Sequence, residues 1–197
     1  MRSAPHRQRQ IERLTTAHTA VSRAVRSAVE QGADLAATDE ARTGMHRCVK
    51  MTAGEAQALL RTSLPRNART APAREAHALL FVGLQQLADE LAAEQSGIVR
   101  PATIAAAAFL LDQLSTWLRV NNQVVCQPGD RLRDSLAERH RIADGLGRDA
   151  TKLRPWGAKS PWHNDGYGTV GNAVPGSFRD PVQIDLEEAI ERAKQTA

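Results

Sequence analysis

The sequence predicts a mostly α-helical protein, a bundle of five to six helices with an irregular, aromatic-bearing C-terminal arm and a terminal helix. Hydrophobic residues make up 42% of the 197 residues but aromatic residues only 4%. The apolar residues are mostly Ala and Leu, which favour helix over sheet. Apolar positions also recur at spacings of three and four, as on one face of a helix. We therefore expect a helical bundle at 1–150, an irregular arm at 151–180, and at 181–197 a helix packed on the bundle or on a partner.

The most apolar stretch of the chain, residues 99–123, is expected to form the central helix. Pro101 suits a first helical turn, where its missing N–H costs nothing, and neither Gly nor Pro interrupts the run that follows. The apolar side chains spread over an arc of roughly 160°, wider than contact with a single neighbour requires. We expect Asp112 on a solvated polar stripe, and Trp117 at the edge of the arc, where it can reach an arm or a partner.

Residues 7–31 carry an a/d heptad pattern over almost three heptads. The positions that alternate at spacings of three and four are Ile11, Leu14, His18, Val21, Val25 and Ala28. This pattern fits a coiled-coil helix that dimerises or enters a partner, and it equally fits a helix packed on its own bundle. The sequence leaves both alternatives open.

The next segments predict shorter helices joined by polar connectors. The capping box Thr52–Ala53–Gly54–Glu55 predicts a short helix that runs to Leu64, before Pro65. A basic connector then leads to a helix at 72–95, which should form an antiparallel hairpin with the central helix. Alternating charges predict a solvated outer helix at 130–145. A last acidic helix should run from residue 180 or 185 to about residue 194.

The arm is poor in regular structure but rich in aromatic side chains. Residues 147–180 contain many Gly and Pro and no usable period, yet they hold four of the seven aromatic residues. A disordered linker is usually poor in aromatics, so we expect this segment to dock on its own bundle or on another subunit. The candidate interface residues are Trp156, Trp162, Tyr167 and Phe178.

The charge pattern permits a nucleic-acid partner without requiring one. The formal net charge is +4 and the isoelectric point about 9.6, with the basic excess at 1–31 and 42–74. The side chains of Arg61, Arg66, Arg69 and Arg74 suit phosphate contacts, which give affinity without sequence specificity. No helix-turn-helix spacing, RNA-binding aromatic motif or zinc finger is present. The basic segment would equally suit an acidic protein surface.

The motifs give little support for an enzyme. No phosphate-binding glycine loop and no serine-nucleophile motif occurs in the sequence. His163 and Asp165 lie close together in the arm, where a His beside an Asp can act as a general base. His46 and Cys48 have no second pair at a metal-binding spacing. We therefore expect neither a metal nor a cofactor.

The function that these features favour is a non-catalytic interaction or assembly subunit, which associates with itself or with another protein through its arm. Small helical proteins with adhesive arms suit phage particles and other multi-subunit assemblies, though only by analogy. Nucleic-acid binding through 42–74 is the alternative, and a small enzyme with a site at His163 and Asp165 is the third. Cys48 and Cys126 lie far apart, and no secretory or membrane segment is found. We expect a soluble cytoplasmic protein with free thiols, within a larger particle if it assembles.

Overall fold

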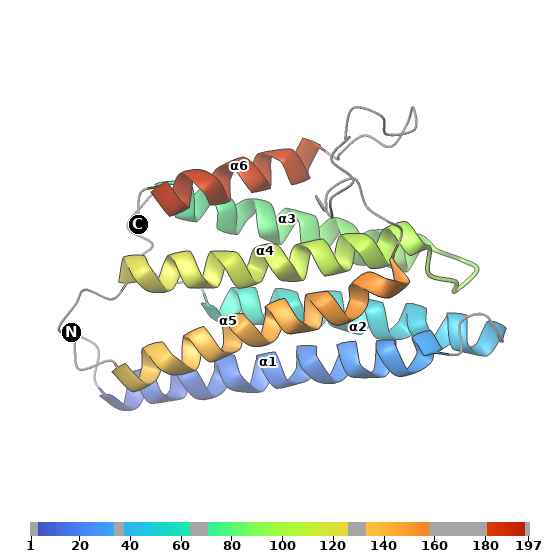
Figure 1. Cartoon of the computed structure of the whole chain (residues 1–197), viewed down its shortest axis with the longest axis horizontal. Coiled ribbons are helices and arrows are strands. Elements are labelled where there is room, and N and C mark those ends of the chain that lie inside the picture. The colour runs from blue at the N-terminus through green and yellow to red at the C-terminus, as the bar shows by residue number, and fades with distance from the viewer. Residues whose placement is uncertain (1–3, 34–37, 64–70, 126–132, 158–180, 196–197) are drawn as a thin grey trace.

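A computed structural model of the chain describes residues 4–33, 38–63, 71–125, 133–157 and 181–195 (Figure 1). These ranges contain six α-helices and no strand, which confirms the predicted mostly α bundle. The helices are α1 (Ala4–Ala33), α2 (Asp39–Ser63), α3 (Ala71–Ala93), α4 (Pro101–Val125), α5 (Arg133–Leu153) and α6 (Pro181–Gln195). A single 3-10 turn, η1 (Arg154–Trp156), follows α5 directly.

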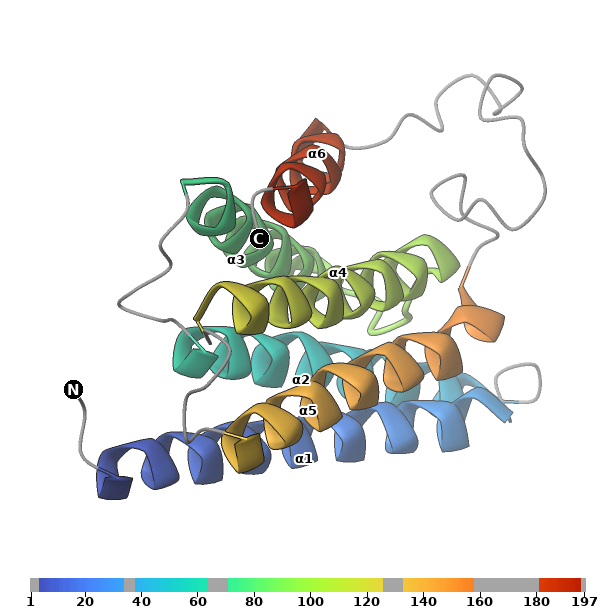
Figure 2. The same cartoon turned by 60° about the vertical axis from the view of Figure 1, so that its left-hand side comes forward.

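Helix α4 lies at the centre of the bundle, as its wide apolar arc predicts. It packs against α2, α3, α5, α6 and η1. Figure 2 shows α3 and α6 on one side of α4, and α1, α2 and α5 on the other. Pro101 is the first residue of the helix, and Ile104, Phe109 and Leu114 are almost completely buried.

Trp117 differs from its prediction because it points into the bundle. Its side chain is 1% exposed, and its indole N–H donates to the carbonyl oxygen of Ala73 in α3 at 2.9 Å. The ring lies 5.1 Å from the ring of His77. Trp117 therefore fixes α4 against α3 and is not available to an arm or a partner. Asp112 stays half-exposed, as expected, with its Oδ2 3.4 Å from Arg154 Nη2.

The heptad stripe of α1 is used inside the protein. Leu14, Val21, Val25 and Ala28 are at most 1% exposed, and α1 packs on α2 and α5. Of the two alternatives left open by the sequence, the helix packed on its own bundle is the correct one. The same stripe cannot at the same time form a coiled coil with another chain.

Helix α2 begins much earlier than the sequence predicted. The hydroxyl of Thr38 accepts a hydrogen bond from the backbone N–H of Ala41 at 3.1 Å, so Thr38 is the N-cap. The expected capping residue, Thr52, donates to the carbonyl oxygen of Cys48 at 2.9 Å, one turn earlier in the same helix. Buried Met45 continues the apolar stripe towards the N-terminus. The predicted short helix is thus the second half of a longer one.

Helix α5 also differs from its prediction, in both length and position. It continues through Gly145 and Gly147 to Leu153, and it packs on both α1 and α4. Ile142, Leu146 and Leu153 are at most 1% exposed, so α5 is a core helix with one charged face. The glycines do not end the helix because the apolar stripe continues past them to buried Ala150 and Leu153. The side chain of His18 lies beside Gly145 and that of Ser115 beside Gly147.

Helix α6 packs beside α3, on the side of α4 that faces away from α1, α2 and α5 (Figure 2). Leu186, Ala189 and Ile190 are at most 2% exposed, and they pack on α3 and α4. Near its C-terminus, Arg192 Nη2 lies 3.0 Å from Glu75 Oε1 of α3. None of the described helices combines the length and the apolar character needed to cross a membrane.

Candidate interaction surfaces

The first predicted interface residue, Trp156, lies against the bundle. It ends η1 and is half-buried, with its indole over Gly32 of α1. A Cβ at Gly32 would lie 2.8 Å from Trp156 Cε2, so only glycine allows this close approach. The indole nitrogen is buried and has no hydrogen-bond partner among the described residues. The other three predicted interface residues, Trp162, Tyr167 and Phe178, lie outside the described residues.

The segment that contains these three aromatics is joined to the bundle at both ends. On its N-terminal side, Gly157 packs on α4, where a Cβ would lie 3.0 Å from the backbone nitrogen of Ala105. On its C-terminal side, Pro181 begins α6. Both attachment points are at the end of the bundle where α4 and α6 begin (Figure 1). Residues 158–180, which lie outside the described residues, connect these two anchored elements along the sequence; we call them the aromatic loop.

The predicted nucleic-acid residues are only partly described. Arg61 is exposed near the end of α2, and its guanidinium carbon lies 5.2 Å from the centroid of the Phe81 ring in α3. Arg74 is exposed in the first turns of α3, two helical turns before Phe81 and thus on the same face. Arg66 and Arg69 lie in the connector between the two helices, outside the described residues.

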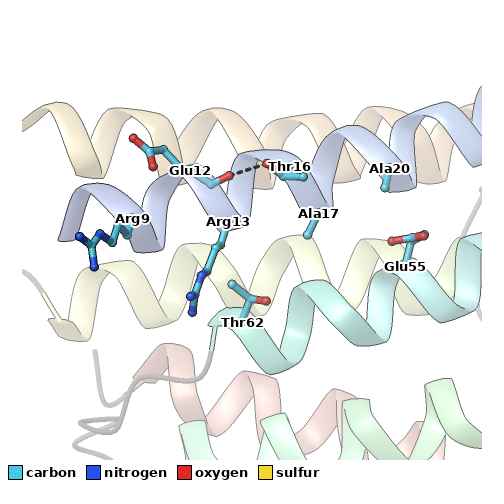
Figure 3. A pocket seen from close by; sticks show the side chains of 8 residues that line it. All are labelled: Arg9, Glu12, Arg13, Thr16, Ala17, Ala20, Glu55 and Thr62. Carbon is cyan, nitrogen blue, oxygen red and sulfur yellow. Dashed lines mark hydrogen bonds between the residues drawn. The ribbon is translucent and has the colours of Figure 1, made fainter. Parts of the chain in front are cut away.

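A groove between α1 and α2 brings together residues that the sequence did not associate. It encloses about 470 Å³ and opens to solvent (Figure 3). Its lining comes from one face of α1 and from the second half of α2: Arg9, Glu12, Arg13, Thr16, Ala17, Ala20, Glu55 and Thr62. The heptad pattern of residues 7–31 does not associate Arg9 and Arg13 with α2, because nothing local shows which helix lies beside them.

A buried polar cluster links α1 to α5. Ser22 Oγ donates to Asp149 Oδ2 at 2.5 Å and lies 3.3 Å from His18 Nε2. Lys152 Nζ donates to the second carboxylate oxygen at 2.9 Å. Asp149 is 2% and His18 8% exposed. Burial lowers the pKa of His18, although the carboxylate of Asp149 acts in the opposite direction.

The geometry of this cluster suits packing better than nucleophilic catalysis. In a catalytic triad the histidine stands between the carboxylate and the serine and accepts the serine proton. Here the serine stands between the other two groups, and its proton goes to Asp149. His18 therefore has no serine proton to accept, and the cluster fixes α1 against α5. Nearby, a hydrogen bond from Arg141 lowers the pKa of Glu138 to about 2, and Thr15 of α1 donates to the same carboxylate.

Metal binding and general-base chemistry find no further support among the residues that can be described. Within them, no three His, Cys, Asp or Glu side chains gather as metal ligands would. The ring of His46 lies 2.9 Å from the carbonyl oxygen of Leu91, and Cys48 is a free thiol whose pKa is raised by burial. His163 and Asp165 lie outside the described residues, so the proposal of a site there stays a prediction.

Comparisons of the chain with protein-family models, with curated proteins and with solved structures gave no match.

Proposed function

We propose that the protein is a non-catalytic interaction or assembly subunit that binds a second copy of itself through the aromatic loop. The observation that supports this most is the attachment of the loop at both ends, by Gly157 on α4 and by the start of α6. A closed loop has fewer conformations than a free arm, so less entropy is lost when it is ordered on a partner. Trp162, Tyr167 and Phe178 would then act as the anchors, since aromatic side chains often dominate interface energies.

The arrangement of the bundle supports the same proposal. Some of its buried polar groups, such as Asp149, make contacts that hold helices together. The apolar stripes of the helices are covered by one another. A partner would therefore bind to the outer surface of the bundle or to the aromatic loop, because the apolar stripes are used inside the bundle.

The test is the molar mass in solution of the intact chain and of a variant in which Trp162, Tyr167 and Phe178 are replaced by Ser. Deletion of everything after residue 150 would be misleading, because it removes buried Leu153 and all of α6. We expect the wild-type chain to form oligomers at micromolar concentration and the loop variant to be monomeric with unchanged helicity.

A matched control replaces the exposed apolar residues Met51 and Val82 by Ser. They are 51% and 42% exposed on α2 and α3 and lie outside the aromatic loop. This control should keep the wild-type mass. A wild-type chain that is monomeric at all concentrations overturns the proposal, and so does a control variant that loses association while the loop variant keeps it.

A further inference from the structure

The groove between α1 and α2 holds two guanidinium groups without a protein partner. Arg9 and Arg13 are both exposed and lie one turn apart on the same face of α1. No hydrogen bond or ion pair with any described residue engages either guanidinium. Some arginines elsewhere on the bundle have carboxylate partners, as Arg119 does with Asp144 at 2.8 Å. The pair in the groove is thus free to bind an anion.

The orientation of the side chains makes one end of the groove positive. Figure 3 shows Arg13 directed towards Thr62 near the end of α2, and Arg9 one turn earlier on α1, beyond the end of α2, while Glu12 leaves α1 in the other direction. Glu55 lies farther along the groove, beside Ala20. The carboxylates that line the groove therefore do not neutralise its arginine end.

Of the polar hydrogen atoms in the groove, those of the threonine hydroxyls are already used inside the helices, so the two arginines are the groups that can donate to a ligand. The hydroxyl of Thr16 donates to the carbonyl oxygen of Glu12, and that of Thr62 to the carbonyl oxygen of Ala58, both at 2.8 Å. Ala17 and Ala20 supply small side chains between the polar ones. Guanidinium groups bind phosphate through two parallel hydrogen bonds. An open groove suits a chain of phosphates lying along it better than a small molecule that must be enclosed.

Further positive charge surrounds this end of the bundle. Arg61 and Arg74 are exposed on the neighbouring α2–α3 surface, and the connector at 64–70, which contains Arg66 and Arg69, begins two residues after Thr62. Cations on the three helices α1, α2 and α3 can meet successive phosphates of one polymer. A single small anion would use only one or two of them.

We propose that Arg9 and Arg13 bind the phosphate backbone of nucleic acid in this groove, without preference for base sequence. This proposal places phosphate contacts on α1, in addition to those that the sequence predicts for the basic segment at 42–74. Binding at the groove does not require the aromatic loop. Each phosphate contact contributes about 0.7 to 0.9 to the slope of log affinity against log salt concentration. Two contacts therefore account for a loss of affinity of about sevenfold to twelvefold between 50 and 200 mM salt.

The experiment uses the full chain with Arg9→Gln and Arg13→Gln combined. The matched control combines Arg23→Gln and Arg26→Gln, which removes the same charge from exposed positions of the same helix outside the groove. Binding of labelled oligonucleotides of two unrelated sequences is measured by fluorescence anisotropy from 50 to 200 mM salt. We expect the groove variant to bind more weakly and to lose the sevenfold to twelvefold part of the salt dependence, while the control stays close to wild type.

Each of the following results would overturn the proposal. The first is that the wild-type chain does not bind either oligonucleotide at 50 mM salt, or that it binds with an affinity that does not depend on salt. The control variant loses as much affinity as the groove variant, which would indicate net charge without a site. The two oligonucleotides differ strongly in affinity, which would indicate base recognition. Vesicles with anionic lipids or a polyglutamate peptide bind at least as tightly as the oligonucleotides, which would assign the groove to another polyanion.

Discussion

The contact between His18 and Gly145 allows a quantitative test of how α1 meets α5. A Cβ at Gly145 would overlap the imidazole of His18, so Gly145→Ala forces the ring to move away from Ser22. Replacing Gly by Ala inside a helix stabilises it by about 1 kcal/mol, while forcing extra volume into a packed site costs about 1 to 3 kcal/mol. We expect Gly145→Ala to leave the free energy of unfolding unchanged or to lower it by up to about 2 kcal/mol.

Gly54→Ala is the matched control, because a Cβ at Gly54 on the exposed side of α2 would contact nothing within 4 Å. It should raise the free energy of unfolding by about 1 kcal/mol, or the melting temperature by about 2 to 4 °C. Both free energies come from urea denaturation followed by circular dichroism. In a His18→Ala background the ring is absent, so Gly145→Ala should become as stabilising as Gly54→Ala. Equal effects of Gly145→Ala with and without His18 would refute the packing argument.

Three further predictions concern the remaining contacts of the core. Burial lowers the pKa of His18 and of His77 below 6.5. As the pH falls below 6.5, the unfolded chain therefore binds more protons than the folded chain, and the free energy of unfolding should decrease. Above pH 7 the free energy of unfolding should stay level. His18→Gln should remove part of this pH dependence, measured by urea titrations at several pH values. Trp117→Phe removes the N–H that donates to Ala73 and leaves unfilled volume, so it should cost about 1 to 3 kcal/mol by the same titration. Ile190→Ala should cost about 2 to 5 kcal/mol, and an unchanged melting temperature would show that α6 does not belong to the cooperative core.

The sequence predicts the helices of this protein well where an apolar stripe is long and continuous. The central position of α4 follows from its wide apolar arc, and the start at Pro101 from proline stereochemistry. Prediction fails where a local signal competes with a stripe. Thr52 and Glu55 match a capping box, but buried Met45 and Val49 carry the apolar face of α2 across that point. Packing on neighbours outweighs a cap, which contributes only about 1 kcal/mol.

The surfaces are harder to predict than the helices because they depend on which helices are neighbours. The phase of α1 places Arg9 and Arg13 on one face, but only the packing of α1 on α2 places Thr62 opposite them. The same limit explains why the prediction for Trp117 was wrong. Its position at the edge of the apolar arc does not show that α3 covers it. Gly145 would end a helix by propensity alone, but α5 continues because buried Leu146 and Leu153 carry its apolar face past that point. The local sequence also does not show that His18 lies beside Gly145.

The groove and the points where the aromatic loop joins the bundle lie at opposite ends of the bundle, and this separation has a testable consequence. Arg13 marks the groove end of α1, and Gly32, under Trp156, marks the end from which the aromatic loop departs. At 1.5 Å per residue these positions are about 28 Å apart, far beyond the distance at which substitutions usually influence each other. The groove variant should therefore keep the wild-type oligomeric mass, and the loop variant should keep the salt dependence of each groove, although oligomers would bind long polymers more tightly than monomers. Loss of both activities in either variant would place the two functions on one surface.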